Sequence, residues 1–186
     1  MTMDEVAAPP DGMDRLWVPH RMAYIKGEKK PQDPSVESCP FCLVTPGPQA
    51  SQDDADHLLI GRGRHCFAVL NLFPYNAGHV MVLPYRHVAA YIDLTDSETA
   101  ELSAMTKMAI QALTAAYKPH GFNLGMNQGE VAGAGIAAHL HQHVVPRWQG
   151  DANFLPIVGQ SKAMPEFLAD TRSRLADAWP THSRNV

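Results

Sequence analysis

The chain has 186 residues, of which 45% are hydrophobic and 18% are charged, and its formal net charge is −4. These values fit one globular domain with a buried core and exclude two large domains. The small negative charge excludes a general basic surface, so no nucleic-acid partner is expected. No apolar run approaches the ~20 residues of a membrane-spanning helix, so no membrane partner is expected either.

Cysteine is sparse, and the three cysteines are Cys39, Cys42 and Cys66. An odd number with one C-x-x-C pair does not resemble the disulfide framework of a small secreted domain. The first residues also lack the pattern of a secretory signal. These features predict a cytoplasmic protein.

The N-terminal part of the chain predicts little regular structure. Residues 1–15 are rich in Pro, Ala and Asp and predict a disordered tail. Residues 16–186 are predicted to form a single domain with an N-terminal arm and a C-terminal extension. Two apolar runs of strand length, 66–70 and 80–83, flank a loop that contains Pro, Asn and Gly.

The second half of the chain predicts a long helix followed by two strands. Thr95 and Glu98 have the spacing of a capping box, and the apolar period after them ends before Pro119. Strands are predicted at 123–127 and 139–145.

A last helix is predicted to begin at Pro165. Two pairs of strands with a helix between them indicate an α+β fold, in which the helix packs on one face of the sheet.

Three histidines alternate with other residues at the predicted last strand, at positions 139, 141 and 143. Side chains two apart on a strand lie on one face, roughly 6.5–7 Å from each other. Three imidazoles at this spacing can converge on one phosphate or metal ion. The plain alternative is a solvated polar face, but a strict period of two over three histidines favours a site.

This stretch resembles the signature of the histidine-triad (HIT) superfamily, His-x-His-x-His followed by apolar positions. Residues 71–84 resemble the nucleotide-binding strand–loop–strand of that superfamily, and residues 123–135 resemble its Asn- and Gly-rich approach to the triad. The resemblance covers about residues 39–155. Residues 145–154 are similar to the bacterial branch that contains diadenosine tetraphosphate phosphorylases and hydrolases.

The resemblance implies a HIT-like fold, an antiparallel sheet of about five strands with a long helix packed on it and a C-terminal helical extension. It implies a nucleotidyl transferase that cleaves dinucleoside polyphosphates, above all diadenosine tetraphosphate, with phosphate as the acceptor. Three alternatives remain: a dinucleoside polyphosphate hydrolase, a purine nucleoside phosphoramidase, and a non-catalytic nucleotide-binding scaffold. A homodimer or tetramer, formed through the long helix and the strand beside it, is also implied.

The resemblance assigns roles to individual residues. His141 is the expected nucleophile, His143 the proton donor to the leaving group, and His79 a partner of the cluster. The second ring nitrogen of His141 is expected to donate to a carbonyl across the Gly-rich loop. The residues expected to bind substrate are Asn71, Asn127, Gly133, Ala134, Gly135, Trp148, Asp151 and Asn153. One departure is the loop at 134–138, which has no polar side chain to hold phosphate.

Cys39 and Cys42 have the spacing of a zinc knuckle, and a tetrahedral zinc site would need two further ligands. The resemblance implies that His87 and His139 supply them. The alternative is a pair of reduced cysteines without metal. Mg²⁺ bound to the polyphosphate substrate is the other expected cofactor.

Overall fold

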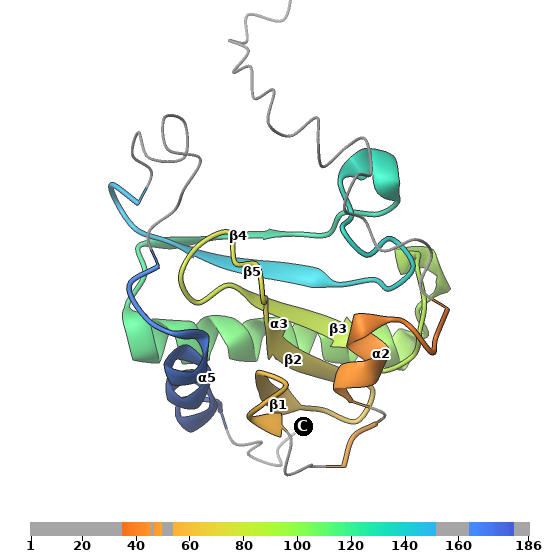
Figure 1. Ribbon diagram of the computed structural model, residues 1–186, viewed down its shortest axis with the longest axis horizontal. Coiled ribbons are helices and arrows are strands. Elements are labelled where there is room, and N and C mark those ends of the chain that lie inside the picture. Colours follow the sequence, from red (N-terminus) through yellow and green to blue (C-terminus); the bar gives the residue numbers. More distant parts are fainter. Residues whose placement is uncertain (1–34, 46, 50–53, 152–163, 181–186) are drawn as a thin grey trace, which may run out of the picture. The chain divides into compact units, whose positions relative to one another are not determined.

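The computed structural model describes residues 35–45, 47–49, 54–151 and 164–180 (Figure 1). Five strands form one antiparallel sheet in the order β1-β2-β3-β5-β4. The fold is therefore α+β with an antiparallel sheet, as the sequence predicts. The predicted tail at 1–15 and its boundary with the N-terminal arm lie outside the described residues.

The elements have the following bounds: α2 (Pro40–Val44), β1 (Leu59–Arg62), β2 (Cys66–Leu70), β3 (Val80–Pro84), η2 (Tyr91–Asp93), α3 (Asp96–Tyr117), β4 (Gly121–Gly125), η3 (Glu130–Ala132), β5 (Gln142–Arg147) and α5 (Leu168–Asp177). The long helix α3 runs along one face of the sheet, and α5 lies near β1 (Figure 1). No helix in the described ranges is both long and apolar enough to cross a bilayer.

The two faces of the sheet bury two separate apolar clusters, because side chains alternate along each strand. The cluster under α3 and α5 contains Ala68, Leu70, Val80, Val82, Val144, Leu102, Met105, Leu113 and Leu175. The cluster on the opposite face contains Cys39, Phe41, Leu59, Phe67, Val69, Met81 and Leu83. The face away from α3 therefore receives α2 and its two cysteines.

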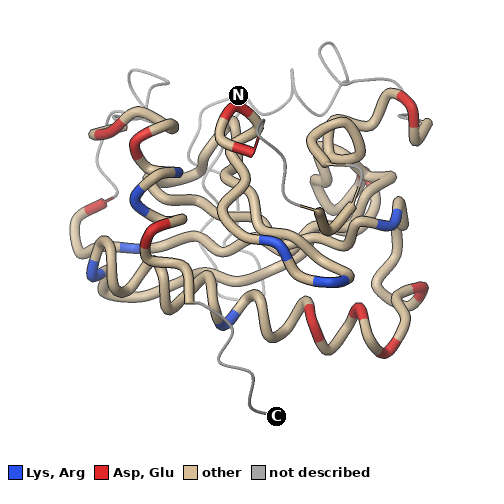
Figure 2. The backbone as a smooth tube through the Cα atoms, turned by 90° about the horizontal axis from the view of Figure 1, so that it is seen from below, with Lys and Arg blue, Asp and Glu red and all other residues tan. Residues whose placement is uncertain are grey.

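Helix α3 begins where the sequence predicts. The Thr95 side chain accepts from the Glu98 backbone N–H, and the Glu98 side chain accepts from the Thr95 backbone N–H, which completes the capping box. Acidic residues of the first turn lie at the positive end of the helix dipole, and Figure 2 shows acidic residues gathered toward one end of this helix. The helix ends at Tyr117, and the next residue, Lys118, adopts a left-handed conformation before Pro119.

The bounds of the last two predicted strands are wrong. The last strand is 142–147 rather than 139–145, because its partner β3 ends at Pro84 and the ladder with β3 stops at the pair Val82–Gln142. The strand predicted at 123–127 is 121–125, because β5 extends far enough to pair with Gly121.

The edge strand β1 has no counterpart among the predicted segments. It is a four-residue strand with a glycine in it, and so it lacks a strong periodic signal. The last helix begins at Leu168 rather than Pro165, and Trp179 lies beyond its end, where the side chain packs on the core under α3.

Candidate active site

A row of histidines lies on the sheet face away from α3. His143 is on β5 and pairs with Met81 of β3, while His79 immediately precedes β3. The rings of His141 and His143 have centroids 4.9 Å apart, and those of His79 and His143 are 5.0 Å apart. The structure thus brings together the three residues that the sequence assigns to catalysis, and all of them are buried.

The tautomer of His141 follows from its backbone contact. Its Nδ1 lies 2.8 Å from the carbonyl oxygen of His139. A carbonyl can only accept, so Nδ1 carries the proton and donates it. Nε2 of the neutral ring then holds a lone pair. The accepting carbonyl belongs to His139, which is itself a member of the triad. The predicted contact across the Gly-rich loop is therefore wrong, because the His141 ring donates to the backbone two residues before it.

The tautomer of His143 is the opposite and follows from a chain of contacts. The Tyr75 backbone N–H donates to Nδ1 of His79 over 3.0 Å, so the proton of the neutral His79 ring is on Nε2. Nε2 of His79 lies 2.9 Å from Nδ1 of His143 and donates to it. The His143 proton is therefore on Nε2. This buried atom is without a hydrogen-bond partner within the described residues.

The imidazoles are neutral near pH 7. Burial, and then the charge of His141, lower the pKa of His143 to about 4. Burial also lowers the pKa of His141, against the opposing hydrogen bond to the His139 carbonyl. A neutral row combines an acceptor nitrogen on His141 with a donor N–H on His143.

Four potential metal ligands form a second cluster beside this row. One ligand atom from each of Cys39, Cys42, His87 and His139 lies within 4.8 Å of the others. Nδ1 of His139 is 3.5 Å from Sγ of Cys39 and 3.6 Å from Sγ of Cys42, and Nδ1 of His87 is 3.3 Å from Sγ of Cys42. Nitrogen and sulfur ligands of a tetrahedral zinc ion lie about 3.3–3.8 Å apart, so these residues fit the ion.

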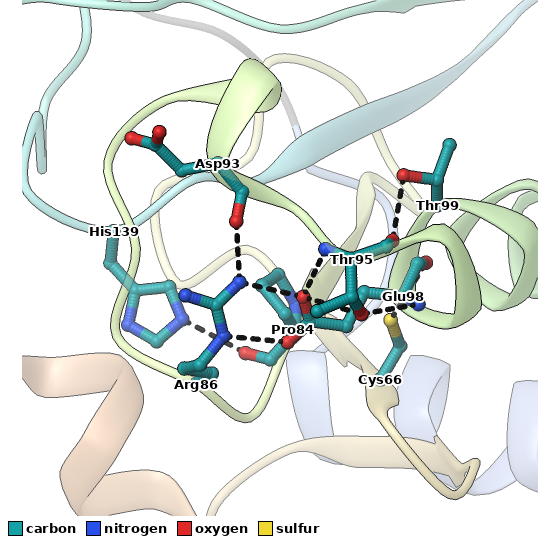
Figure 3. Close-up of polar contacts among 8 residues, drawn as sticks. All are labelled: Cys66, Pro84, Arg86, Asp93, Thr95, Glu98, Thr99 and His139. Carbon is teal, nitrogen blue, oxygen red and sulfur yellow. Dashed lines mark hydrogen bonds and ion pairs between the residues drawn. The ribbon is translucent and has the colours of Figure 1, made fainter.

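The back of the metal cluster is fixed by the end of β3 and the loop after it. Nε2 of His139 lies 2.9 Å from the Pro84 carbonyl and donates to it, which leaves Nδ1 to face the thiols (Figure 3). Two residues further on, Arg86 forms an ion pair with Glu98 over 2.7 Å. The hydrogen bond from Arg86 is the main cause that lowers the pKa of Glu98 to about 2, and it outweighs burial, which acts to raise that pKa. The loop that carries His87 is thereby attached to the start of α3.

The knuckle between the two cysteines also contacts the nucleophile. Phe41 is buried, and its ring centroid lies 5.4 Å from that of His139 and 5.2 Å from that of His141. Sequence reasoning missed Phe41, Tyr75 and Asn76, because a single aromatic or amide residue in a loop has no periodic signal.

The residues predicted to bind substrate have different surroundings. Asn71 follows β2 and contacts His79, with its Nδ2 3.3 Å from Nδ1 of that ring. Asn127 lies in the loop after β4, and half-buried Trp148 lies directly after β5. Asn153 lies outside the described residues.

Two residues of the predicted phosphate-binding loop use their backbone N–H groups for hydrogen bonds within the protein. The N–H groups of Gly133 and Ala134 donate to the carbonyls of Glu130 and Gly129, whereas Gly135 is exposed. These two N–H groups therefore hold the turn together.

Asp151 is engaged in a similar way. It forms an ion pair with Arg147 over 2.7 Å, and it accepts from Nδ2 of Asn76 and from the Trp148 N–H. The hydrogen bond from the Arg147 guanidinium is the main cause that lowers the pKa of Asp151 below its usual range. This carboxylate fixes the turn that carries Trp148.

The fold and the histidine row together define a histidine-triad protein. The model of the HIT domain matches residues 52–150, and the chain belongs to this family. It is 50% identical over 169 residues to the AP-4-A phosphorylase of Mycobacterium tuberculosis, covering 91% of this chain and 86% of that protein. It is 34% identical over 84 residues to the asymmetrical bis(5'-nucleosyl)-tetraphosphatase of Schizosaccharomyces pombe, covering 45% of this chain and 46% of that one.

A solved structure has the same fold. The Zn-bound histidine triad family protein of Mycobacterium smegmatis superposes with a TM-score of 0.60 at 23% identity, covering 77% of this chain and 94% of that one.

Proposed function

We propose that this protein is a nucleotidyl transferase that cleaves diadenosine tetraphosphate and passes the adenylyl group to inorganic phosphate, with ADP and ATP as products. The opposite tautomers of two adjacent histidines carry this proposal: His141 offers a lone pair where His143 offers a proton. The similarity to the mycobacterial AP-4-A phosphorylase along most of both chains supports the choice of substrate and acceptor.

The first step forms a covalent intermediate. Nε2 of His141 attacks the α-phosphorus, the P–N bond forms, and the bond between the α-phosphorus and its bridging oxygen breaks. The Nε2–H of the neutral His143 donates a hydrogen bond to that oxygen, which leaves as the anionic terminal phosphate of ATP without taking the proton. The N–H of His141 stays on the His139 carbonyl and holds the ring while positive charge develops.

The second step reverses the first with a new acceptor. A phosphate oxygen attacks the adenylyl phosphorus, the P–N bond breaks, and ADP leaves. The attacking oxygen is an unprotonated one of monohydrogen phosphate, so the proton of that ion leaves with ADP or passes to solvent, and His143 keeps its Nε2 proton throughout. We assign binding to the side chain of Asn71 at the ribose, the side chain of Asn127 and the backbone N–H of Gly135 at the phosphates, and the ring of Trp148 at a base.

The test is incubation of the protein with diadenosine tetraphosphate, with and without inorganic phosphate. Phosphate-dependent formation of ADP and ATP is expected, and a mass increase of one adenylyl group on a peptide containing His141 is expected when phosphate is left out. His141→Ala should remove both signals and keep the circular dichroism spectrum. Turnover to AMP and ATP without phosphate would make the protein a hydrolase. Cleavage of an adenosine phosphoramidate alone would make it a phosphoramidase, and binding without products a scaffold.

We also propose that Cys39, Cys42, His87 and His139 hold a structural zinc ion, and that Mg²⁺ accompanies the polyphosphate. Zinc would supply a cross-link between α2, the loop after β3 and the triad, without entering the reaction. Burial, followed by the charge of Cys39, raises the pKa of Cys42 to about 11. Zinc must therefore displace a proton from this thiol to bind, and the affinity for zinc should decrease as the pH is lowered.

Metal analysis of the purified protein tests the zinc proposal. About one zinc ion per chain is expected, and Cys42→Ser should lose most of it. Cys66→Ser is the matched control, since Cys66 lies in the core under α3. Zinc content unchanged in Cys42→Ser, or none in the parent protein, would refute the site.

A further inference from the structure

The amide of Asn71 has a fixed orientation. Its Oδ1 lies 3.0 Å from the Phe73 backbone nitrogen, which can only donate, so the oxygen must face that group. The nitrogen Nδ2 then faces His79, 3.3 Å from Nδ1. The Asn71 backbone N–H also donates to the His79 carbonyl over 2.9 Å. The side chain and backbone of one residue thus both hold His79.

We propose that Asn71 is a positioning residue that keeps the proton of His79 on Nε2 and, through His79, the proton of His143 on the nitrogen that faces the leaving group. This role extends the proposed function, on which it rests, because Asn71 acts through a second residue rather than only on substrate.

The argument is one of matching donors and acceptors. Nδ1 of His79 receives two N–H groups, from Tyr75 and from Asn71. If Nδ1 carried a proton, it would point at both N–H groups, and the two hydrogen bonds to Nδ1 would be lost. Loss of hydrogen bonds to a buried atom is costly. His79 is fully buried, so water cannot replace those bonds. The His79 proton is therefore confined to Nε2, where it meets Nδ1 of His143 at 2.9 Å.

The ring of Tyr75 lies tilted against the two histidine rings. Its centroid lies 4.6 Å from that of His79 and 5.4 Å from that of His143. The ring covers the histidine pair while its backbone N–H supplies one of the two donors. Asn71 supplies the other donor from a side chain, so a substitution of Asn71 can change that donor without altering the Tyr75 backbone N–H or the Tyr75 ring.

Asn71→Asp is the sharpest test, because it replaces the donor with an acceptor of nearly the same shape. A carboxylate at this place attracts a proton to Nδ1 of His79. Long-range ¹H–¹⁵N spectra of the free protein report the tautomer of each ring. In the parent protein His79 and His143 are both expected to carry their proton on Nε2. In Asn71→Asp, Nδ1 of His79 is expected to be protonated, and unchanged His79 and His143 signals would overturn the proposal.

Kinetics separate positioning from contact with ribose. Loss of a correctly placed hydrogen-bond donor on His143 should lower kcat of Asn71→Asp by about 10–100-fold, in addition to any rise in KM that follows from the lost contact with ribose. A rise in KM with an unchanged kcat would overturn the proposal. If Asn71→Asp does not fold, Asn71→Ala replaces it: kcat is expected to fall at least about fivefold whatever the change in KM, and a kcat equal to that of the parent would overturn the proposal.

The control is Asn123→Asp, which places the same charge on exposed β4, where Asn123 accepts from Arg147. This variant is expected to keep the parent spectra of both histidines. The spectra are recorded without substrate, so their outcome does not depend on the proposed function. A parent protein that leaves diadenosine tetraphosphate uncleaved would refute that function alone.

Discussion

Two identical side chains of the triad have opposite proton positions because their neighbours differ. His141 faces a carbonyl and must donate from Nδ1, whereas His143 faces the N–H of another imidazole and must accept at Nδ1. Burial keeps both rings neutral, since the charged form loses its hydration. At the scale of the residue, the contacts around each ring therefore determine which histidine attacks and which one donates.

The low pKa of His143 predicts a pH-dependent stability. Above about pH 6.5 the ring is neutral in both the folded and the unfolded chain, and it contributes nothing. As the pH falls from about 6.5 to about 4, this histidine takes up a proton in the unfolded chain but stays neutral in the folded one. The free energy of unfolding therefore decreases by up to about 3 kcal/mol. The free energy of unfolding, measured in urea across this range, should fall less steeply for His143→Gln. Parallel curves would contradict the low pKa.

At the scale of the element, the loop after β3 depends on α3. Glu98 both completes the capping box and pairs with Arg86, and this loop carries His87 toward the thiols. The short helix α2 reaches the same place from the other side, and its Phe41 contacts His139 and His141. Two segments far apart in the sequence are thereby held against the triad.

Glu98→Gln should weaken this attachment. The amide loses the charge that pairs with Arg86 and that faces the helix N-terminus, so the free energy of unfolding should fall by about 1–2 kcal/mol. Urea unfolding gives the stability, and competition with a chelator gives zinc affinity, which should fall as well. Asp96→Asn is the control: it removes a charge from the same turn at an exposed position. Equal stability losses in the two variants would show that only the helix dipole matters.

At the scale of the whole molecule, the two edges of the sheet differ. At β1, Arg172 of α5 donates to the Leu59 carbonyl, and the Trp179 ring packs so closely on Gly61 that a Cβ there would collide with it. At β4, Leu124 is 51% exposed on the strand that ends the sheet order. An exposed edge strand that carries an apolar side chain favours association.

We therefore expect association through β4 and predict that Leu124→Lys lowers the oligomeric state. Light scattering after gel filtration should give a dimer or tetramer for the parent protein and a smaller mass for the variant, because a buried ammonium group is costly. Val36→Lys introduces the same charge at a residue that is 59% exposed outside the sheet, and it should keep the parent mass. A monomeric parent protein would contradict this expectation.

Much of the fold and site follows from local patterns. The capping box at Thr95 and Glu98, the apolar period of α3 and the stop before Pro119 are local, and the structure has them where the sequence predicts. The alternation of three histidines correctly placed His141 beside His143, but His139 faces the thiols instead, and its ligand role, like the roles of His79 and His87, came from the family resemblance and not from spacing. The start of β5 escaped prediction because it depends on where its partner β3 ends.

The sequence by itself determined which residue types lie in the site, because spacing along a strand and around a helix is a property of the local chain. Only the tertiary structure decided where the protons are. The His79 tautomer depends on Tyr75 and Asn71 across a loop, and that of His143 on a ring 64 positions away. Such contacts form when strands pair, so a donor or acceptor role becomes defined only in the folded protein.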